Sequence, residues 1–315
     1  MAKVDLVVVT GAAGFIGSHL CDALLAKGYR VRGADDMSAG EHSNLESARA
    51  HDGFEFHQAD VSDLDVCRKL CAGATAVLHE AAQSSVPASV EAPERAHKDT
   101  CTSTLHMLTA AREAGARRFL LAASAACYSE QAPQPLVEKT LLWPLSPYAA
   151  AKIASEQYVK AFAGMGLDGV CLRYFNVYGP RHSAKSSYAN VIPAFTRRIL
   201  DGGEITVYGD GEQTRDFVHV SDVVRANLLA LEREKPLGGI SINIATGHST
   251  SINALAHSIA KACGRELELK HQDVRAGDFK HSLADVSLAK SELGFEAQVG
   301  LDAGIASVVE WMKQA

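Results

Sequence analysis

The chain has 315 residues and a mass of 33.5 kDa, which predicts one large domain or two closely associated ones. Its 47% hydrophobic and 22% charged residues are typical of globular proteins and exclude extended disorder. The formal net charge of −6 excludes the overall positive field of proteins that bind nucleic acids or anionic membranes.

The sequence also argues against a membrane segment and a disulfide framework. The apolar run Val4–Val9 is too short for a signal peptide, and no uninterrupted apolar stretch of about 18 residues occurs. The cysteines are odd in number and dispersed, and Cys67 and Cys71 lack a second Cys or His pair at zinc-site spacing. We therefore expect a cytoplasmic protein without a metal site.

Short apolar runs alternate with longer helical patterns in the first half of the chain. Apolar strands separated by helices predict an α/β fold whose doubly wound parallel sheet is covered on both faces. In chain order, the expected elements are strand Val4–Val9, helix Ile16–Lys27, strands Tyr29–Ala34 and Phe54–His57, helix Leu64–Leu70, strand Ala76–Leu78, helix Arg95–Ala114, strand Phe119–Ala123, helix Tyr148–Phe162 and strand Gly169–Tyr174.

Beyond Asn176 the pattern changes, because proline and glycine interrupt it more often. We expect two units, residues 1–176 and a smaller mixed α/β unit of residues 177–315, with part of 217–248 returning to the first. The helices expected in this half are Val191–Leu200, Val220–Leu231, Ile252–Cys263 and Leu301–Lys313.

A glycine-rich turn, with Gly11, Gly14 and Gly17, joins the first strand to the first helix. Glycines let backbone amides approach a pyrophosphate at a helix N-terminus, where the helix dipole favours an anion. Asp35 follows the second strand, where a carboxylate binds the adenosine ribose and repels a 2′-phosphate. The combination predicts a site for NAD rather than NADP, although a turn that only packs is the alternative.

Tyr148 and Lys152 stand one helical turn apart, so the phenol and the ammonium share one helix face. A tyrosine needs a nearby positive charge to act as a base near neutral pH. Ser124 ends a buried strand at the sheet edge where such folds bind ligands. These three residues are the candidate catalytic set, although each also has an ordinary structural explanation.

The glycine turn, Ser124, Tyr148-x-x-x-Lys152 and the run Leu172–Arg181 together resemble the extended short-chain dehydrogenases/reductases, and most closely their NAD-dependent UDP-sugar 4-epimerases. The resemblance extends from Val7 to about Trp311. It implies a Rossmann-type domain followed by a smaller nucleotide-sugar domain. It also implies a homodimer formed through the helices Arg95–Ala114 and Tyr148–Phe162.

The resemblance also implies an NAD site that is larger than the glycine turn. Three positions depart from the family pattern: Thr100 replaces an asparagine, Ser129 replaces a glycine, and Glu80 stands beside the near-apolar nicotinamide wall, where a buried carboxylate is costly. Besides the turn, Asp35, Tyr148 and Lys152, the residues implied to contact NAD are Phe15, Ile16, Asp36, Gly40, Asp60, Val61, Ala81, Ala82, Thr100 and Tyr174.

For the substrate, the resemblance implies that Arg215 and Arg275 contact a diphosphate, whose oxygens match the guanidinium fork. Ser282 stands where glucose-specific epimerases carry a bulky tyrosine, and a small residue there leaves room for an N-acetyl group. With Ser124, the residues implied to contact the UDP-sugar are Ser84, Asn176, Asn190, Val191, Thr206, Tyr208, Arg215, Arg275, Asp278 and Ser282.

The expected reaction is inversion at C4 through a transient 4-keto sugar, with UDP-GlcNAc/UDP-GalNAc as the main pair and UDP-Glc/UDP-Gal as a further pair. Ala125 and Ala126 follow Ser124 where related dehydratases and decarboxylases carry acids, which disfavours elimination. A UDP-glucuronate 4-epimerase, an NADP-dependent reductase and a non-catalytic dinucleotide sensor stay open as alternatives.

Overall fold

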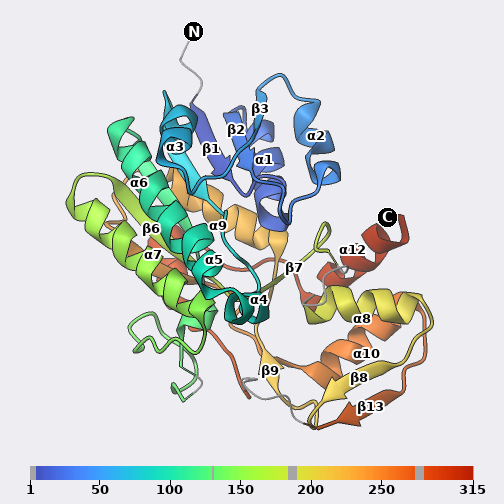
Figure 1. The fold of residues 1–315 in the computed structure, drawn as a ribbon. Helices are drawn as coiled ribbons and strands as arrows, with labels where there is room; N and C mark the ends of the chain where they lie inside the picture. The colour runs from blue at the N-terminus through green and yellow to red at the C-terminus, as the bar shows by residue number, and fades with distance from the viewer. Residues whose placement is uncertain (1–4, 130, 184–189, 274–279, 315) are drawn as a thin grey trace.

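The computed structural model describes residues 5–129, 131–183, 190–273 and 280–314. Its centre is a seven-stranded parallel sheet with the order β11-β6-β5-β4-β1-β2-β3 (Figure 1). Most of these strands are continuous apolar runs because both faces of the sheet are covered. Their bounds are β1 Leu6–Thr10, β2 Arg30–Asp35, β3 Phe54–Gln58, β4 Ala76–His79, β5 Arg118–Ser124, β6 Asp168–Tyr174 and β11 Ile240–Ile244.

Two layers of helices cover the sheet, which confirms the predicted doubly wound α/β class. On one face, α3 (Leu64–Cys71), α6 (Ser103–Glu113) and α7 (Pro147–Gly164) pack over β4, β5 and β6. On the other face lie α1 (Phe15–Ala26), α9 (Val220–Glu232) and α11 (Ser287–Leu293). The short helix α2 (Glu46–Arg49) packs beside α1.

The predicted helix Arg95–Ala114 is interrupted in the structure. It consists of α5 (Pro93–His97), a wide π-helical turn Lys98–Thr102 and α6, and is preceded by α4 (Val86–Glu91). The hydroxyls of Ser103 and Thr104 donate to the carbonyl oxygen of Thr100, at 3.1 and 2.6 Å. Such side-chain bonds compete with the regular helical ladder, which explains the wider turn.

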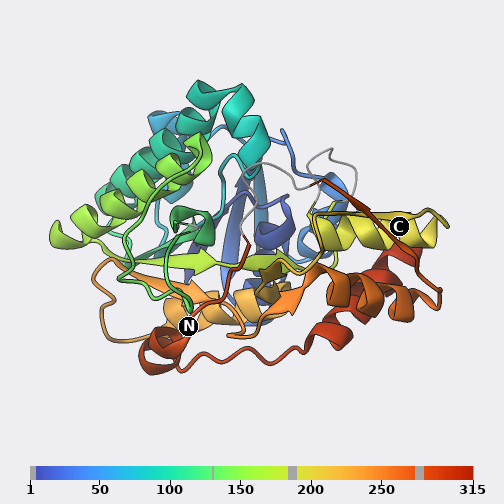
Figure 2. The ribbon, with the colours of Figure 1, turned by 90° about the horizontal axis from the view of Figure 1, so that it is seen from below.

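The smaller lobe has its own core, formed around α8 (Val191–Leu200), α10 (Ile252–Cys263) and α12 (Leu301–Gln314). Beside these helices, the parallel strands β8 (Ile205–Tyr208) and β13 (Leu269–Gln272) form a ribbon. In Figures 1 and 2 this lobe, coloured yellow to red, lies to one side of the sheet, and α6 and α7 lie on the opposite flank.

Two further two-stranded ribbons lie between the smaller lobe and the central sheet. β7 (Asn176–Tyr178) pairs in parallel with β10 (Phe217–His219), and β9 (Thr214–Arg215) pairs in antiparallel fashion with β12 (Thr250–Ser251). After β10, α9 packs on α1, and β11 then joins β6 in the central sheet. The division into units 1–176 and 177–315 stays a prediction. Among the described residues, no helix is long and apolar enough to cross a membrane.

Candidate active site

The turn between β1 and α1 requires glycine for reasons that the geometry makes plain. Gly11 has φ +64°, and a Cβ there would lie 2.9 Å from the amide nitrogen of Ala81. A Cβ at Gly17 would lie 2.1 Å from the carbonyl oxygen of Gly11. Gly14, which precedes α1, provides no side-chain cap, so the first amides of the helix are left for an anion. The cradle therefore fits a dinucleotide pyrophosphate.

Asp35 is held directly against this turn. Its carboxylate accepts hydrogen bonds from the amides of Ala13, at 2.9 Å, and Met37, at 2.8 Å. Burial raises the pKa of Asp35, and the two backbone hydrogen bonds oppose that shift. A Cβ on Gly40 would lie 2.9 Å from Asp35 Oδ1, so the loop after β2 also closes on the carboxylate. Asp36 is exposed and accepts from Ser38 instead.

The remaining predicted NAD residues fall into buried and exposed groups. Thr100 is buried, and its hydroxyl oxygen accepts from the amide of Gln83 at 3.3 Å, which ties the segment after β4 to the π-helical turn. Asp60 is exposed and forms an ion pair with Lys98 at 2.9 Å. Val61 is buried, whereas Phe15, Ile16, Ala81 and Ala82 are half-buried and Ser84, predicted to contact the sugar, is exposed.

Ser124, Tyr148 and Lys152 come together where β5 ends and α7 begins. Ser146 caps α7 by accepting from the amide of Ala149 at 3.2 Å, and Pro147 begins the helix, so the cap orients the first turn. The ammonium of Lys152 lies 5.9 Å from the centroid of the Tyr148 ring. It also donates to the carbonyl oxygen of Ala122 at 2.7 Å, which anchors it to β5.

Burial dominates the protonation of this set. It raises the pKa of Tyr148 to about 12, although a hydrogen bond with Ser124 acts in the opposite direction. Burial also lowers the pKa of Lys152, and the charge of Glu80 partly restores it. The hydrogen bond with Ser124 does not outweigh burial at Tyr148, so a phenolate at this position depends on positive charge nearby.

Several predicted substrate residues converge on the segment 214–216. The amide and the side chain of Asn176 donate to the carbonyl oxygen of Asp216, at 3.1 and 3.2 Å. The amide of Ser282 donates to the carbonyl oxygen of Thr214 at 3.1 Å, which places the half-buried Ser282 beside the strand that carries Arg215.

Asp216 itself serves the fold. Its carboxylate accepts from the amide and hydroxyl of Thr246, at 2.9 and 2.6 Å, and from the amide of Gly247 at 2.9 Å. Burial raises the pKa of Asp216, and these bonds oppose the shift. They hold the strand that carries Arg215 against the loop after β11.

The other predicted substrate residues lie in the smaller lobe. Thr206 and the exposed Tyr208 belong to β8, which pairs with strand Leu269–Gln272. Asn190 precedes α8, which begins at Val191, and its side chain contacts the ring of His182 at 3.1 Å. Arg275 and Asp278 lie outside the described residues.

The segment after Gly179 docks on α1, a contact that the sequence reasoning missed. His182 stacks on Phe15 with ring centroids 4.3 Å apart, and Arg181 forms an ion pair with Asp22 at 2.7 Å. His19 bonds to the carbonyl oxygen of Pro180 at 3.0 Å. These contacts tie the start of the smaller lobe to the helix that follows the glycine turn. The sequence motif Leu172–Arg181 includes Arg181, but the motif does not indicate that this segment contacts α1.

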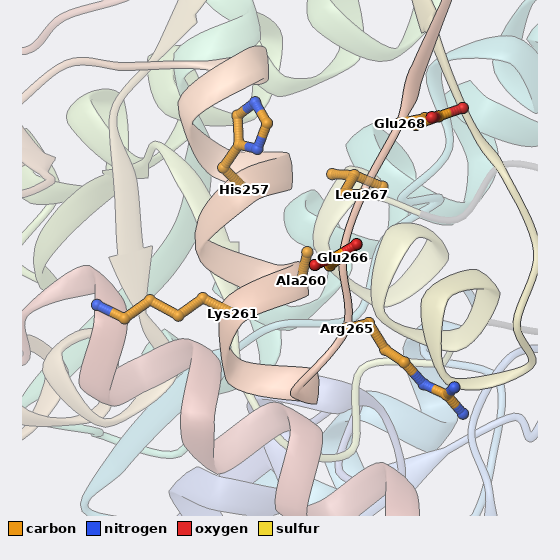
Figure 3. A pocket seen from close by; sticks show the side chains of 7 residues that line it. All are labelled: His257, Ala260, Lys261, Arg265, Glu266, Leu267 and Glu268. Carbon is orange, nitrogen blue, oxygen red and sulfur yellow. The ribbon is translucent and has the colours of Figure 1, made fainter.

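One hollow in the structure does not belong to this site. A hollow at the end of α10, shown in Figure 3, is lined by charged side chains that point in different directions, and none of its residues comes from the central sheet. The residues lining it are His257, Ala260, Lys261, Arg265, Glu266, Leu267 and Glu268.

Within the described ranges, no group of three or more His, Cys, Asp or Glu residues is arranged to hold a metal ion.

The fold and the site define a two-lobed Rossmann-fold protein of the short-chain dehydrogenase/reductase class. The model of the NAD dependent epimerase/dehydratase family matches residues 7–245, and the chain belongs to this family. The resemblance to NAD-dependent UDP-sugar 4-epimerases is thereby confirmed, and NAD is the cofactor.

Relatives match the chain over almost its whole length. It is 39% identical to a UDP-glucose 4-epimerase of Mycolicibacterium smegmatis, over 97% of this chain and 98% of the relative. Among solved structures, a UDP-N-acetylglucosamine 4-epimerase from Methanobrevibacter ruminantium in complex with UDP-N-acetylmuramic acid has a TM-score of 0.94 and 38% identity, covering 99% of both chains. A UDP-glucose 4-epimerase from Thermotoga maritima with UDP-glucose has a TM-score of 0.92 and 36% identity, covering 98% of this chain and 99% of that one.

Proposed function

We propose that the chain catalyses NAD-dependent epimerisation at C4 of a UDP-hexose, with UDP-GlcNAc and UDP-GalNAc as its main substrate pair. The observation that carries the proposal is the juxtaposition of Ser124, Tyr148 and Lys152 at the carboxyl edge of a sheet whose neighbouring turn fits a dinucleotide. Ligands of doubly wound sheets bind at this edge. The enzyme is then an isomerase that also converts UDP-Glc and UDP-Gal.

The roles of the three residues follow from their protonation. Tyr148 removes the proton of the C4 hydroxyl, and Ser124, which shares a hydrogen bond with the phenol, orders the oxygens involved. Lys152 supplies positive charge to the phenolate from its anchored position over β5. Bound NAD would supply the hydride-transfer chemistry at C4, with hydride removed from one face of the sugar and returned to the other. Tyr148 then returns the proton, so one cycle consumes nothing.

The proposed cofactor contacts use the groups described above. The amides after Gly11 and Gly14 hold the pyrophosphate, and Asp35 binds the adenosine ribose. Arg215 and Asn176 hold the diphosphate of the substrate near the segment 214–216. Firm anchoring of the nucleotide lets the hexose turn between the two hydride transfers.

Replacement of Tyr148 by phenylalanine tests the reaction. We expect turnover of UDP-GlcNAc to UDP-GalNAc, followed by chromatography, to fall at least about 10³-fold, because the acid–base group is lost. Tyr158→Phe is the matched control, since Tyr158 lies on the same helix and is 37% exposed. Retention of full turnover by Tyr148→Phe contradicts the proposal. Absence of wild-type turnover on a panel that includes UDP-glucuronate, with NAD bound, favours a sensor.

Ser282 is the proposed determinant of the sugar. Its small side chain, placed by the bond to Thr214, leaves volume for an N-acetyl group when the hexose turns. We expect Ser282→Tyr to lower kcat/KM for UDP-GlcNAc by roughly 10- to 100-fold and to spare UDP-Glc, a difference that a pocket residue can produce. The exposed Ser291→Tyr is the control. Equal losses on both sugars contradict the assignment.

We also propose that two copies pair through α6 and α7, as the family resemblance implies, and that the enzyme works in the cytoplasm. All seven cysteines are free thiols in the structure, and burial raises the pKa of each of them, which suits a reducing compartment. Light scattering on the purified enzyme tests the dimer, and a monomer at micromolar concentration contradicts it.

A further inference from the structure

Glu80 lies at the junction of the glycine turn and the catalytic helix. It directly follows β4, and a Cβ on Gly11 would lie 3.1 Å from its backbone carbonyl carbon. The phenol of Tyr174 donates to Glu80 Oε1 at 2.9 Å, and the amide of Asn227 donates to the oxygen of Tyr174 at 2.8 Å. β4, β6 and α9 therefore hold this carboxylate in one orientation.

The charges of Glu80 and Lys152 act on each other: burial lowers the pKa of Lys152, and the negative charge of Glu80 opposes that shift. Of the acidic groups that act on the Lys152 ammonium, Glu80 has the largest effect. The other carboxylate, Glu156, is already paired with Arg173 through two hydrogen bonds of 2.8 and 2.6 Å. Glu80 is thus the acid that balances Lys152 in this pocket.

Charge balance has a direct consequence for a nicotinamide ring. The ring carries a positive charge in oxidised NAD and none in the reduced form. A buried ammonium at Lys152 disfavours a second positive charge nearby, because like charges repel more strongly in a protein interior than in water. A fixed carboxylate in the same pocket offsets this repulsion.

We propose that Glu80 is a charge-compensating residue that makes the pocket favour oxidised over reduced NAD. The sugar then gives up its C4 hydride against an opposing bias, and the return of hydride to the keto sugar is favoured. The device keeps the cofactor from being trapped in the reduced form, and no outside oxidant is needed. The inference rests on the proposed function only for its catalytic consequence, since the binding preference depends on NAD alone.

The test measures the redox equilibrium of the bound cofactor in the holoenzyme. Wild type and Glu80→Gln are titrated with a mediator couple of known potential, and reduced NAD is followed by its absorbance. Glutamine keeps an acceptor for Tyr174 and removes the charge. We expect the ratio of reduced to oxidised cofactor at a fixed potential to rise roughly tenfold in Glu80→Gln. A ratio unchanged within twofold overturns the proposal.

Tyr174→Phe provides the second variant, because it keeps the charged side chain and removes the hydrogen bond that favours its ionised form. We expect a smaller shift in the same direction, and no further shift when Tyr174→Phe is added to Glu80→Gln. An equal shift in both backgrounds shows that the effect does not pass through the carboxylate and overturns the proposal. Neither measurement uses a UDP-sugar, so failure here is separate from failure of the epimerase assignment.

Discussion

Two carboxylates, Glu156 on the catalytic helix α7 and Glu80 directly after β4, differ in how fully their negative charge is compensated. Glu156 receives two hydrogen bonds from the guanidinium of Arg173 and one from the hydroxyl of Ser241, at 2.9 Å. Its side chain is 2% exposed, and that of Arg173 is 4% exposed. The same guanidinium donates to the phenol oxygen of Tyr128 at 2.9 Å, so the pair ties α7 to β6 and to the loop after β5.

The negative charge of Glu80 is less fully compensated. It accepts from the phenol of Tyr174, and the attraction of Lys152 adds to this, yet burial still raises its pKa to about 7. A charge that costs folding energy without full compensation is typical of functional sites. Glu156 therefore holds the catalytic helix in place, whereas Glu80 is tolerated for its effect on the pocket.

Breaking the Glu156 pair has the largest expected effect. Glu156→Gln removes the negative charge and leaves the buried Arg173 uncompensated, which lowers the free energy of unfolding by about 3–5 kcal/mol. Urea denaturation measures it. The control is Glu232→Gln, which breaks the exposed 2.7 Å pair with Lys27 and is expected to cost less than about 1 kcal/mol. Similar losses in both variants contradict the structural role of the Glu156–Arg173 pair.

The uncompensated charge of Glu80 makes the stability of the protein depend on pH. Its folded pKa of about 7 lies above the ordinary value of 4.5, so its contribution to stability is complete below about pH 4.5 and is lost as the pH rises through 7. Between pH 5 and pH 8, cofactor-free wild type should lose about 2 kcal/mol more than Glu80→Gln. Urea unfolding at the two pH values measures this. Equal losses of stability in wild type and Glu80→Gln contradict the raised pKa of Glu80.

Tyr174→Phe gives the smallest expected effect. The phenol's hydrogen bond lowers the pKa of Glu80, so its loss raises that pKa further and moves the pH-dependent fall in stability upward. Near neutral pH the unfolding free energy should drop by about 1 kcal/mol, the usual contribution of one hydrogen bond. The same series of urea curves serves as the measurement. A loss that is independent of pH shows that Tyr174 acts through packing alone.

Local patterns predicted much of the fold. The alternation of apolar runs and helical periods gave the doubly wound sheet, because strand and helix faces must be buried with periods that the sequence displays. The prediction of one continuous helix over Arg95–Ala114 was wrong. The hydroxyls of Ser103 and Thr104 widen the turn, and they leave no periodic pattern in the sequence. Of the candidate site, Tyr148 and Lys152 were predictable because a single helical turn separates them.

Other parts of the site depended on contacts between distant segments. The sequence marked Glu80 as unusual, but it did not show that Tyr174 from β6 would donate to it, or that Asn227 from α9 would donate to Tyr174. Nor did it show that Arg173 would pair with Glu156, or that Arg181 and His182 would dock on α1. Such pairings follow from the strand order, which brings together residues far apart in the chain.

The turn that requires glycine, the spacing that places Tyr148 and Lys152 on one face, and the acid at Asp35 could be predicted from the chain alone, because each depends on neighbours within a few residues. How these groups are charged depends on the tertiary fold. Burial and long-range partners set the pKa values of Tyr148, Lys152 and Glu80, and both arise only when the sheet and its two helical layers close around the site.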